Sequence, residues 1–293
     1  MIKPPSQSMK NVEILLDNVG KQPMHLRVDK SKWDKYDMTL EENKSKRYKG
    51  LVVAVSGFSK VGKTYTAMSA EEYLGYIGKI YELGPGLPMY YIDTENTAYA
   101  EYKRHHDGKL IKILNIENIN PSTLEEDPLA SFEEIKEMAY SASDNGRGVV
   151  VIDSLTDHCD WASEVMIEKK KDEGNFSPYD HGKLKKEIKT FLRKMKAKEM
   201  IVLYTFQIKK EYEKTGVGVW DFTETGGYLL EATKGVEHWC DVLVRLEKML
   251  SGDNIVRQAY ITGSRFEDST INIKEISTSN KFVDIMKKIE PYL

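Results

Sequence analysis

The stretch that decides the fold is residues 51–64, which read LVVAVSGFSKVGKT. Residues 51–55 form a continuous apolar run, which is typical of a strand buried on both faces. The run leads into a glycine, and residues 57–64 fit the pattern G-x-x-x-x-G-K-[ST] at every fixed position. Over residues 64–76 the apolar side chains fall at roughly helical spacing. The stretch therefore predicts a strand, a glycine-rich loop and a helix in immediate succession.

The residue types in this loop suit a phosphate ligand. Gly57 and Gly62 let the backbone turn without a Cβ atom in the way. The amides then point inward as an anion nest, and the following helix adds its partial positive charge. Lys63 is predicted to reach the β- and γ-phosphates, and Thr64 to offer its hydroxyl to Mg²⁺. The predicted ATP-binding residues are Gly57, Phe58, Ser59, Lys60, Val61, Gly62, Lys63, Thr64 and Tyr65.

Composition narrows the classes of protein that the chain can be. Its 293 residues are 40% hydrophobic and 30% charged, so a packed core is feasible and wholesale disorder is excluded. Lys and Arg number 43 against 46 Asp and Glu, so any nucleic-acid surface must be local. Two cysteines, Cys159 and Cys240, exclude a disulfide scaffold. We find no apolar signal core or membrane-length run, and therefore expect a cytoplasmic protein (host cytoplasm if viral) and no membrane partner.

Apolar runs and amphipathic segments alternate along the rest of the chain. The expected strands cover residues 89–92, 110–116, 149–152, 200–206, 242–246, 256–261 and 271–276, and the expected helices cover 129–143, 182–198 and 282–289. Buried strands that alternate with amphipathic helices predict an α/β three-layer sandwich with a mostly parallel sheet. The closely spaced last strands predict an antiparallel C-terminal extension. We expect residues 1–48 to be an N-terminal arm and residues 49–293 to be one domain.

Two of the predicted strands end in acidic residues. Asp153 follows the strand over 149–152, at the edge where α/β folds bind ligands, and is predicted to hold Mg²⁺ together with Thr64. Glu95 follows the strand over 89–92 and could orient or deprotonate an attacking water. Simpler interpretations remain open, because Asp153 could merely begin a loop and Asp93 could cap a helix that starts near residue 97.

The phosphate loop, residues 91–95 (YIDTE) and residues 151–154 (VIDS) together resemble the ATPase core of the RecA/RadA recombinases. The resemblance covers roughly residues 49–276 and implies a RecA-like P-loop NTPase fold. It implies that Glu95 is the catalytic carboxylate and that Gln207, at the end of residues 202–207, senses the γ-phosphate. It also implies ATP and Mg²⁺ as cofactors, single-stranded DNA as a partner and a homo-oligomer.

The C-terminal part resembles shorter phage and archaeal RecA-core proteins, some of which support single-strand annealing. This similarity rests on residues 261–266 (ITGSRF), and it implies that Arg265 is a nucleotide-contacting or inter-subunit arginine. Gly226 and Gly227, followed by residues 241–246, are similar to the stretch after the second DNA-binding loop of the family. No Phe here has Ala three residues later, so the assembly segment of many members is absent and an accessory or viral role is favoured over full strand exchange.

Residues 209–225 are the better candidate for a nucleic-acid surface. We expect a flexible loop whose basic and aromatic side chains hold a single strand: Lys209, Lys210, Tyr212, Lys214, Trp220 and Phe222. Its position after Gln207 would let the ATP state alter it. An ordinary surface loop with one packed Trp is the alternative. The lysine-rich helix over 182–198, preceded by Lys169, Lys170 and Lys171, is favoured as a solvated face.

Other functions are compatible with the same phosphate loop. One is a regulatory or DNA-packaging ATPase, and another is a P-loop kinase for a small metabolite, although we see no arginine-rich lid segment. A protein that binds ATP without hydrolysing it is a third. The possible metal ligands lack zinc-site spacing, so structural or incidental roles are favoured for them: His158, Cys159, His181, His238 and Cys240.

Overall fold

The computed structural model describes residues 51–74, 87–105, 111–116, 118, 127–144, 148–171, 178–198, 200–215, 222–251, 254–264 and 280–289. Its strands are β1 (Val52–Gly57), β2 (Met89–Asp93), β3 (Ile111–Asn115), β4 (Val149–Asp153), β5 (Ile201–Lys214), β6 (Phe222–Leu230), β7 (Val242–Ser251) and β8 (Asn254–Ser264). Its helices are α3 (Lys63–Met68), α5 (Ala98–His105), α6 (Pro128–Asp144), α7 (Leu155–Lys171), α8 (Pro178–Lys196), the 3-10 turn η4 (Glu237–Trp239) and α9 (Phe282–Ile289). The expected arm over residues 1–48 and the expected strand over 271–276 lie outside the described residues.

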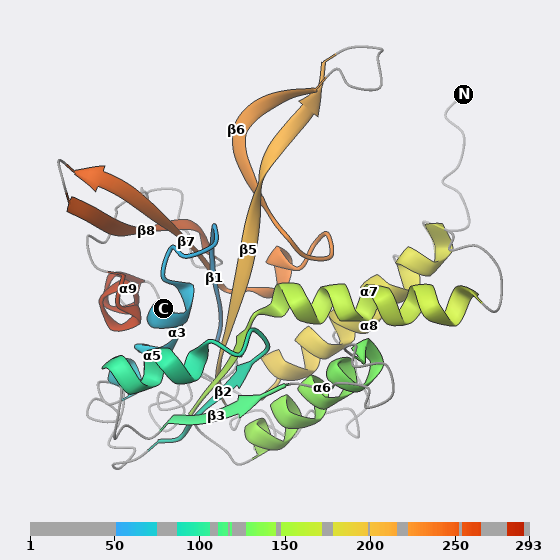
Figure 1. Ribbon diagram of the computed structural model, residues 1–293, viewed down its shortest axis with the longest axis horizontal. Helices are drawn as coiled ribbons and strands as arrows, with labels where there is room; N and C mark the ends of the chain where they lie inside the picture. The colour runs from blue at the N-terminus through green and yellow to red at the C-terminus, as the bar shows by residue number, and fades with distance from the viewer. Residues whose placement is uncertain are drawn as a thin grey trace, which may run out of the picture. The chain divides into compact units, whose positions relative to one another are not determined.

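The strands form one sheet in the order β3-β2-β4-β5-β1-β7-β8, with β6 paired to β5. The pairings between β1, β2, β3, β4 and β5 are parallel, and β1 also pairs in parallel with β7. Antiparallel pairing joins β7 to β8 and β5 to β6. The predicted α/β fold with a mostly parallel sheet is confirmed (Figure 1). The predicted antiparallel C-terminal extension is confirmed by the antiparallel pairing of β7 with β8, and β7 also continues the parallel sheet beside β1.

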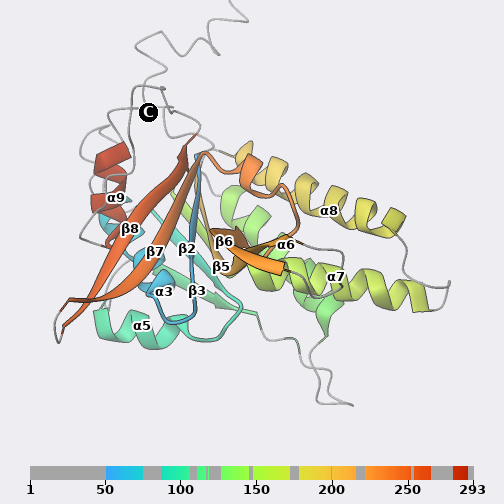
Figure 2. The same ribbon diagram turned by 90° about the horizontal axis from the view of Figure 1, so that it is seen from above.

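Helices cover both faces of the sheet, which explains the apolar run in β1. Val53 and Val55 belong to a core on the side of α3 and α9, whereas Val52 and Ala54 belong to a core on the side of α6, α7 and α8. Figure 2 shows these two groups of helices on opposite sides of the strands. Successive residues of a strand point to opposite faces, so a strand covered on both sides has to be apolar throughout. The three predicted layers are therefore confirmed.

The segment after Gln207 is a β-ribbon, and the prediction of a flexible loop over residues 209–225 was wrong for the described part of it. The β5–β6 ladder runs from the Ile208–Leu230 pair to the Lys214–Phe222 pair, with a register shift beyond Lys210. The ribbon extends away from the rest of the sheet (Figure 1). Because a two-stranded ribbon of this kind has no face against a core, its sequence lacks the apolar alternation that predicts strands. Trp220 lies outside the described residues.

Candidate nucleotide site and the root of the ribbon

The predicted site residues of four strands meet at one edge of the sheet. Gly57 at the end of β1 pairs in register with Gln207 of β5, and Asp93 at the end of β2 pairs with Asp153 at the end of β4. All four strands are parallel, so their carboxyl ends meet on the same side. This is the edge where open α/β sheets bind ligands.

The backbone of the phosphate loop accounts for its two fixed glycines. A Cβ atom on Gly57 would lie 2.6 Å from Cγ1 of Val61 and 2.9 Å from the carbonyl oxygen of Leu246, so no other residue fits there. Gly62 has a φ of 106°, which side chains rarely adopt. The Nζ atom of Lys63 donates hydrogen bonds to the carbonyl oxygens of Gly57, at 3.1 Å, and Phe58, at 3.2 Å. The loop therefore folds around the ammonium group of Lys63.

Asp153 is held by three hydroxyl groups. It accepts a hydrogen bond from Oγ1 of Thr64 at 2.8 Å, and further ones from the hydroxyls of Tyr91 and Thr205. The three donors come from α3, β2 and β5, so the fold fixes the orientation of the carboxylate. A hydroxyl and a carboxylate oxygen in contact are hard oxygen donors that suit Mg²⁺. The chemistry of Thr64 and Asp153 thus fits a magnesium-bound nucleotide.

The acidic end of β2 divides into two roles. Asp93 is buried and accepts hydrogen bonds from the backbone N–H of Glu95, at 3.2 Å, and of Ala98, at 2.8 Å. Asp93 therefore caps the start of α5, as the simpler interpretation of this segment expected. Glu95 follows it with its side chain partly exposed, and only its backbone takes part in this cap.

Electrostatics connect Glu95 to the phosphate loop. Burial lowers the pKa of Lys63, and the carboxylates of Asp153 and Glu95 act against this effect. Partial burial raises the pKa of Glu95, the charges of Asp153 and Asp157 raise it further, and Lys63 lowers it. Glu95 and Lys63 therefore lie close enough to act on each other's charge. Glu95 stands two residues after the end of β2, so its backbone lies at the same edge of the sheet as the phosphate loop.

Sequence reasoning missed a cluster of polar residues beside Asp153. Asp157, in the first turn of α7, accepts hydrogen bonds from the hydroxyls of Thr94 and, at 2.9 Å, Ser154. The backbone N–H of Ser154 donates to Oγ1 of Thr94 at 2.7 Å. The signal in the sequence was Asp157, four residues after Asp153. It becomes informative only once α7 is recognised as a helix that begins right after β4.

The remaining predicted residues fall in different places. The backbone N–H of Gln207 donates to Oγ1 of Thr156 at 3.0 Å, and its carbonyl accepts from the N–H of Glu231 at 2.8 Å, so Gln207 forms the root of the ribbon. Ser59 and Lys60 are exposed, and the ring of Tyr65 packs edge-on against His105, at 5.6 Å between centroids. Arg265 lies outside the described residues.

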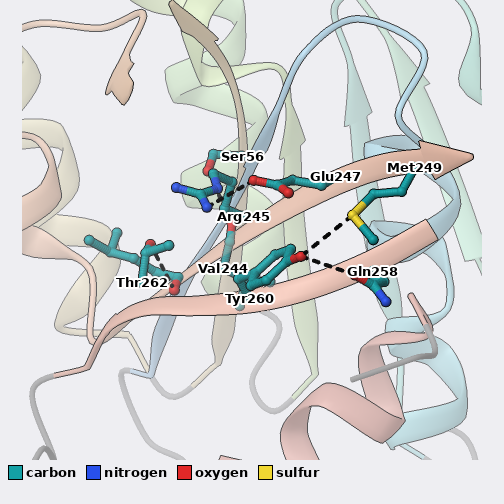
Figure 3. A network of polar contacts seen from close by, with 9 residues as sticks. Ser56, Val244, Arg245, Glu247, Met249, Gln258, Tyr260 and Thr262 are labelled. Atoms are coloured by element: carbon teal, nitrogen blue, oxygen red, sulfur yellow. Dashed lines mark hydrogen bonds and ion pairs between the residues drawn. The ribbon is translucent and has the colours of Figure 1, made fainter. Parts of the chain in front are cut away.

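Aromatic and cationic side chains connect the phosphate loop to the ribbon. The rings of Phe58 and Tyr228 meet edge to face, with centroids 5.6 Å apart. The guanidinium of Arg245 lies 4.8 Å from the centroid of Tyr228 and 5.4 Å from that of Tyr260, and it pairs with Glu247 at 2.8 Å. Figure 3 shows Arg245, Glu247 and Tyr260 projecting together from β7 and β8, beside Ser56 of β1.

Of the possible metal ligands, His158 lies in the core and not at the nucleotide edge. His158 is buried between the rings of Phe132 and Phe191, with centroids 4.6 and 4.8 Å away. Within the described ranges, no group of His, Cys, Asp or Glu could hold a metal ion without other ligands. The described helices include none that is long and apolar enough to cross a membrane.

A glycine-rich loop between a central strand and a helix, with Asp153 across from Thr64, defines a P-loop NTPase-type domain. Residues 49–265 match the family model described as an AAA domain, and the chain belongs to this family. A search of curated proteins finds no match to the chain. The family assignment supports a nucleotide-binding ATPase domain that works with Mg²⁺.

Proposed function

We propose that this protein is a RecA-like ATPase that hydrolyses ATP with Mg²⁺ and couples hydrolysis to the binding of single-stranded DNA in recombination, repair or replication. The observation that carries the proposal is the position of Glu95. It follows β2 at the nucleotide edge, and the pKa of its carboxyl responds to both Lys63 and Asp153. A carboxylate in this place is what the RecA resemblance requires.

The residues of the edge divide the chemistry among themselves. The loop amides and Lys63 bind the phosphates, while Thr64 and Asp153 hold Mg²⁺, which neutralises charge on the phosphate oxygens when it is bound. Glu95 accepts a proton from the attacking water. At the same time the oxygen of this water bonds to the γ-phosphorus, and the bond from that phosphorus to the β–γ bridging oxygen breaks. A raised pKa strengthens Glu95 as a proton acceptor. Gln207 connects this edge to the ribbon.

The ribbon supplies a surface that suits a single strand. Lys209 is exposed, and Tyr212 is exposed by 56%, so β5 presents a cation and an aromatic ring to a ligand. Such groups hold a single strand through its phosphates and through stacking on its bases. The root of β5 pairs with the phosphate loop at the Gly57–Gln207 position, which gives the ATP state a route to the ribbon.

We also infer from the resemblance that copies of the chain assemble, with Arg265 reaching the nucleotide of a neighbouring subunit. The size of the protein in solution, measured by light scattering with and without ATP, tests this part of the proposal. A monomer under both conditions would contradict it.

The proposed function is tested by measuring ATP turnover of the full chain alone, with single-stranded DNA and with duplex DNA of the same sequence. We expect single-stranded DNA to raise turnover several-fold and to bind with a strong dependence on salt. Equal turnover in all three reactions, without salt-sensitive binding, would favour a regulatory or packaging ATPase. Phosphate that appears on an added small-molecule acceptor would favour a kinase.

A further inference from the structure

Two cavities lie at the root of the ribbon, on either side of residues 231–234, which follow β6. One, of about 540 Å³, is lined by parts of α7 and α8, and the other, of about 630 Å³, by parts of β1 and β7. Lys209, Ala232, Thr233 and Lys234 line both of them. The cavities therefore share a wall that carries two ammonium groups.

The shared wall carries cations and no carboxylate. Lys185 is a further cation of the first cavity and Arg245 of the second, so the two linings together hold four cations. They also hold four carboxylates, two in each cavity. Within the described part of the chain, Lys185, Lys209 and Lys234 form no ion pair, whereas Lys210 on the outer ribbon pairs with Glu224 at 3.0 Å. In the described structure the ammonium groups of the shared wall are therefore outside any ion pair, and the charge of Lys209 counteracts the rise that burial causes in the pKa of Asp160.

The four carboxylates lie outside the shared wall. In the second cavity, Glu211 already accepts a hydrogen bond from Thr225 at 2.8 Å, and Glu237 accepts one from the N–H of Gly235 at 3.1 Å. In the first cavity, Asp160 and Glu231 are acceptors that suit the exocyclic amino group of a base such as cytosine.

The second cavity also has an apolar side. It is lined by the side chains of Ile208, Leu229, Leu230 and Leu243 and by the ring of Tyr228. Leu229 is exposed by 45% and Tyr228 by 37%, so apolar surface faces the hollow. A flat ligand with apolar faces and an anionic link suits such a cavity, and an unpaired nucleotide has this composition.

We propose that the two cavities hold consecutive nucleotides of one DNA strand, and that Lys209 and Lys234 bind the phosphate that joins them. This inference rests on the proposed function and deepens it, because it gives the strand a defined path at the root of the ribbon. A base must leave its pairing partner to enter either cavity. The two cavities, together called the groove, therefore select single strands over duplexes. The second cavity adjoins the phosphate loop, because Tyr228 lines this cavity and its ring contacts that of Phe58.

The test is the affinity of the full chain for a fluorescein-labelled oligodeoxycytidine, measured by anisotropy over a range of salt concentrations. The protein carries a non-hydrolysable ATP analogue and Mg²⁺. We compare the wild type with a double variant that carries both Lys209→Ala and Lys234→Ala. The matched control is the pair Lys186→Ala and Lys189→Ala, on the part of α8 that lines neither cavity.

We expect the Lys209 and Lys234 pair to bind about tenfold more weakly, with a salt slope smaller by about one, because one phosphate contact is lost. The control pair should bind as the wild type does. The pair Lys209→Arg and Lys234→Arg should also bind, because arginine keeps the charge. A loss that arginine does not restore would overturn the proposal, since charge would then not be the cause.

The strand path through the two cavities and the proposed function are overturned by different results. If the wild type binds the oligonucleotide and the alanine pair binds it equally well with the same salt slope, the groove is wrong and the proposed function stands. If the wild type does not bind single-stranded DNA at all, the proposed function is wrong, and the groove is overturned with it.

Discussion

The nucleotide edge and the root of the ribbon are neighbours, yet they are built in opposite ways. At the edge, the carboxylate of Asp153 is fixed by hydrogen bonds from three hydroxyls. At the root, Arg245 packs between two aromatic rings, and its Nε atom is buried without a hydrogen-bond partner in the described structure. Hydrogen bonds demand particular atoms in particular places, whereas ring contacts depend on flat surfaces that can shift. The edge therefore suits chemistry, and the root suits contacts that change.

The largest effect that separates the two regions should come from Lys63→Ala. This change removes the buried ammonium around which the phosphate loop folds, and should lower ATP turnover by at least about 100-fold, as removal of one group that stabilises developing charge does elsewhere. Binding of a fluorescent ATP analogue and release of phosphate measure the change. Lys112→Ala, on the exposed face of β3, is the control and should keep wild-type turnover. Wild-type turnover in the Lys63 variant would contradict the site.

The second effect concerns α7, where Asp157 faces the nucleotide edge and its neighbour His158 faces the core against α6 and α8. Asp157 is hydrogen-bonded at the edge, whereas neither ring nitrogen of His158 has a partner in the described structure. Burial, together with a smaller effect of the charge of Lys136, lowers the pKa of His158 to about 3. At a pH between the ordinary and the lowered pKa, His158 is protonated in the unfolded chain and neutral in the folded chain. The contribution of His158 to the free energy of unfolding is therefore fully present above about pH 6.5 and is lost as the pH falls toward 3.

Between pH 7 and pH 5 this histidine should cost about 2 kcal/mol of unfolding free energy, as measured by urea denaturation. His158→Leu should remove that part of the pH dependence. His238→Leu is the control, because the side chain of His238 is 81% exposed, and it should keep the wild-type pH dependence. The same pH dependence in the His158 variant as in the wild type would show that the ring is not held neutral in the core.

The smallest effect should come from Tyr228→Ala, which removes the contacts of the ribbon with Phe58 and Arg245. We expect the gain in single-strand affinity caused by an ATP analogue to shrink by about 2- to 10-fold, the value of one aromatic contact. Anisotropy with and without the analogue measures it. Tyr212→Ala, farther out on β5, should weaken strand binding and keep the nucleotide effect. An unchanged nucleotide effect in the Tyr228 variant would exclude this contact as the connection.

The nucleotide edge was largely predictable because its signals are local. The apolar run before Gly57, the fixed positions of the loop and the acids that end β2 and β4 all lie within short segments. Parallel strands then bring these segments together whatever the details of the loops. Asp157 escaped because α7 has too weak an apolar stripe to predict a helix.

The root of the ribbon was not predictable because its contacts join distant residues. Ser56 and Arg245 pair across β1 and β7, and Phe58 meets Tyr228 from another strand. The ribbon has no apolar alternation, so its charged sequence was interpreted as a loop. The contacts at the root and the strand structure of the ribbon both depend on pairing between distant segments, and no short-range pattern encodes this pairing.

The central claim is that Glu95 activates water at the nucleotide edge, and single-turnover hydrolysis by Glu95→Gln tests it most directly. The variant keeps the shape of the side chain and removes its ability to take a proton, so the rate of phosphate release should fall at least about 100-fold while ATP remains bound. Glu187→Gln, exposed on α8, should hydrolyse ATP at the wild-type rate. Hydrolysis by Glu95→Gln at the wild-type rate, with the nucleotide bound equally well, would contradict the account.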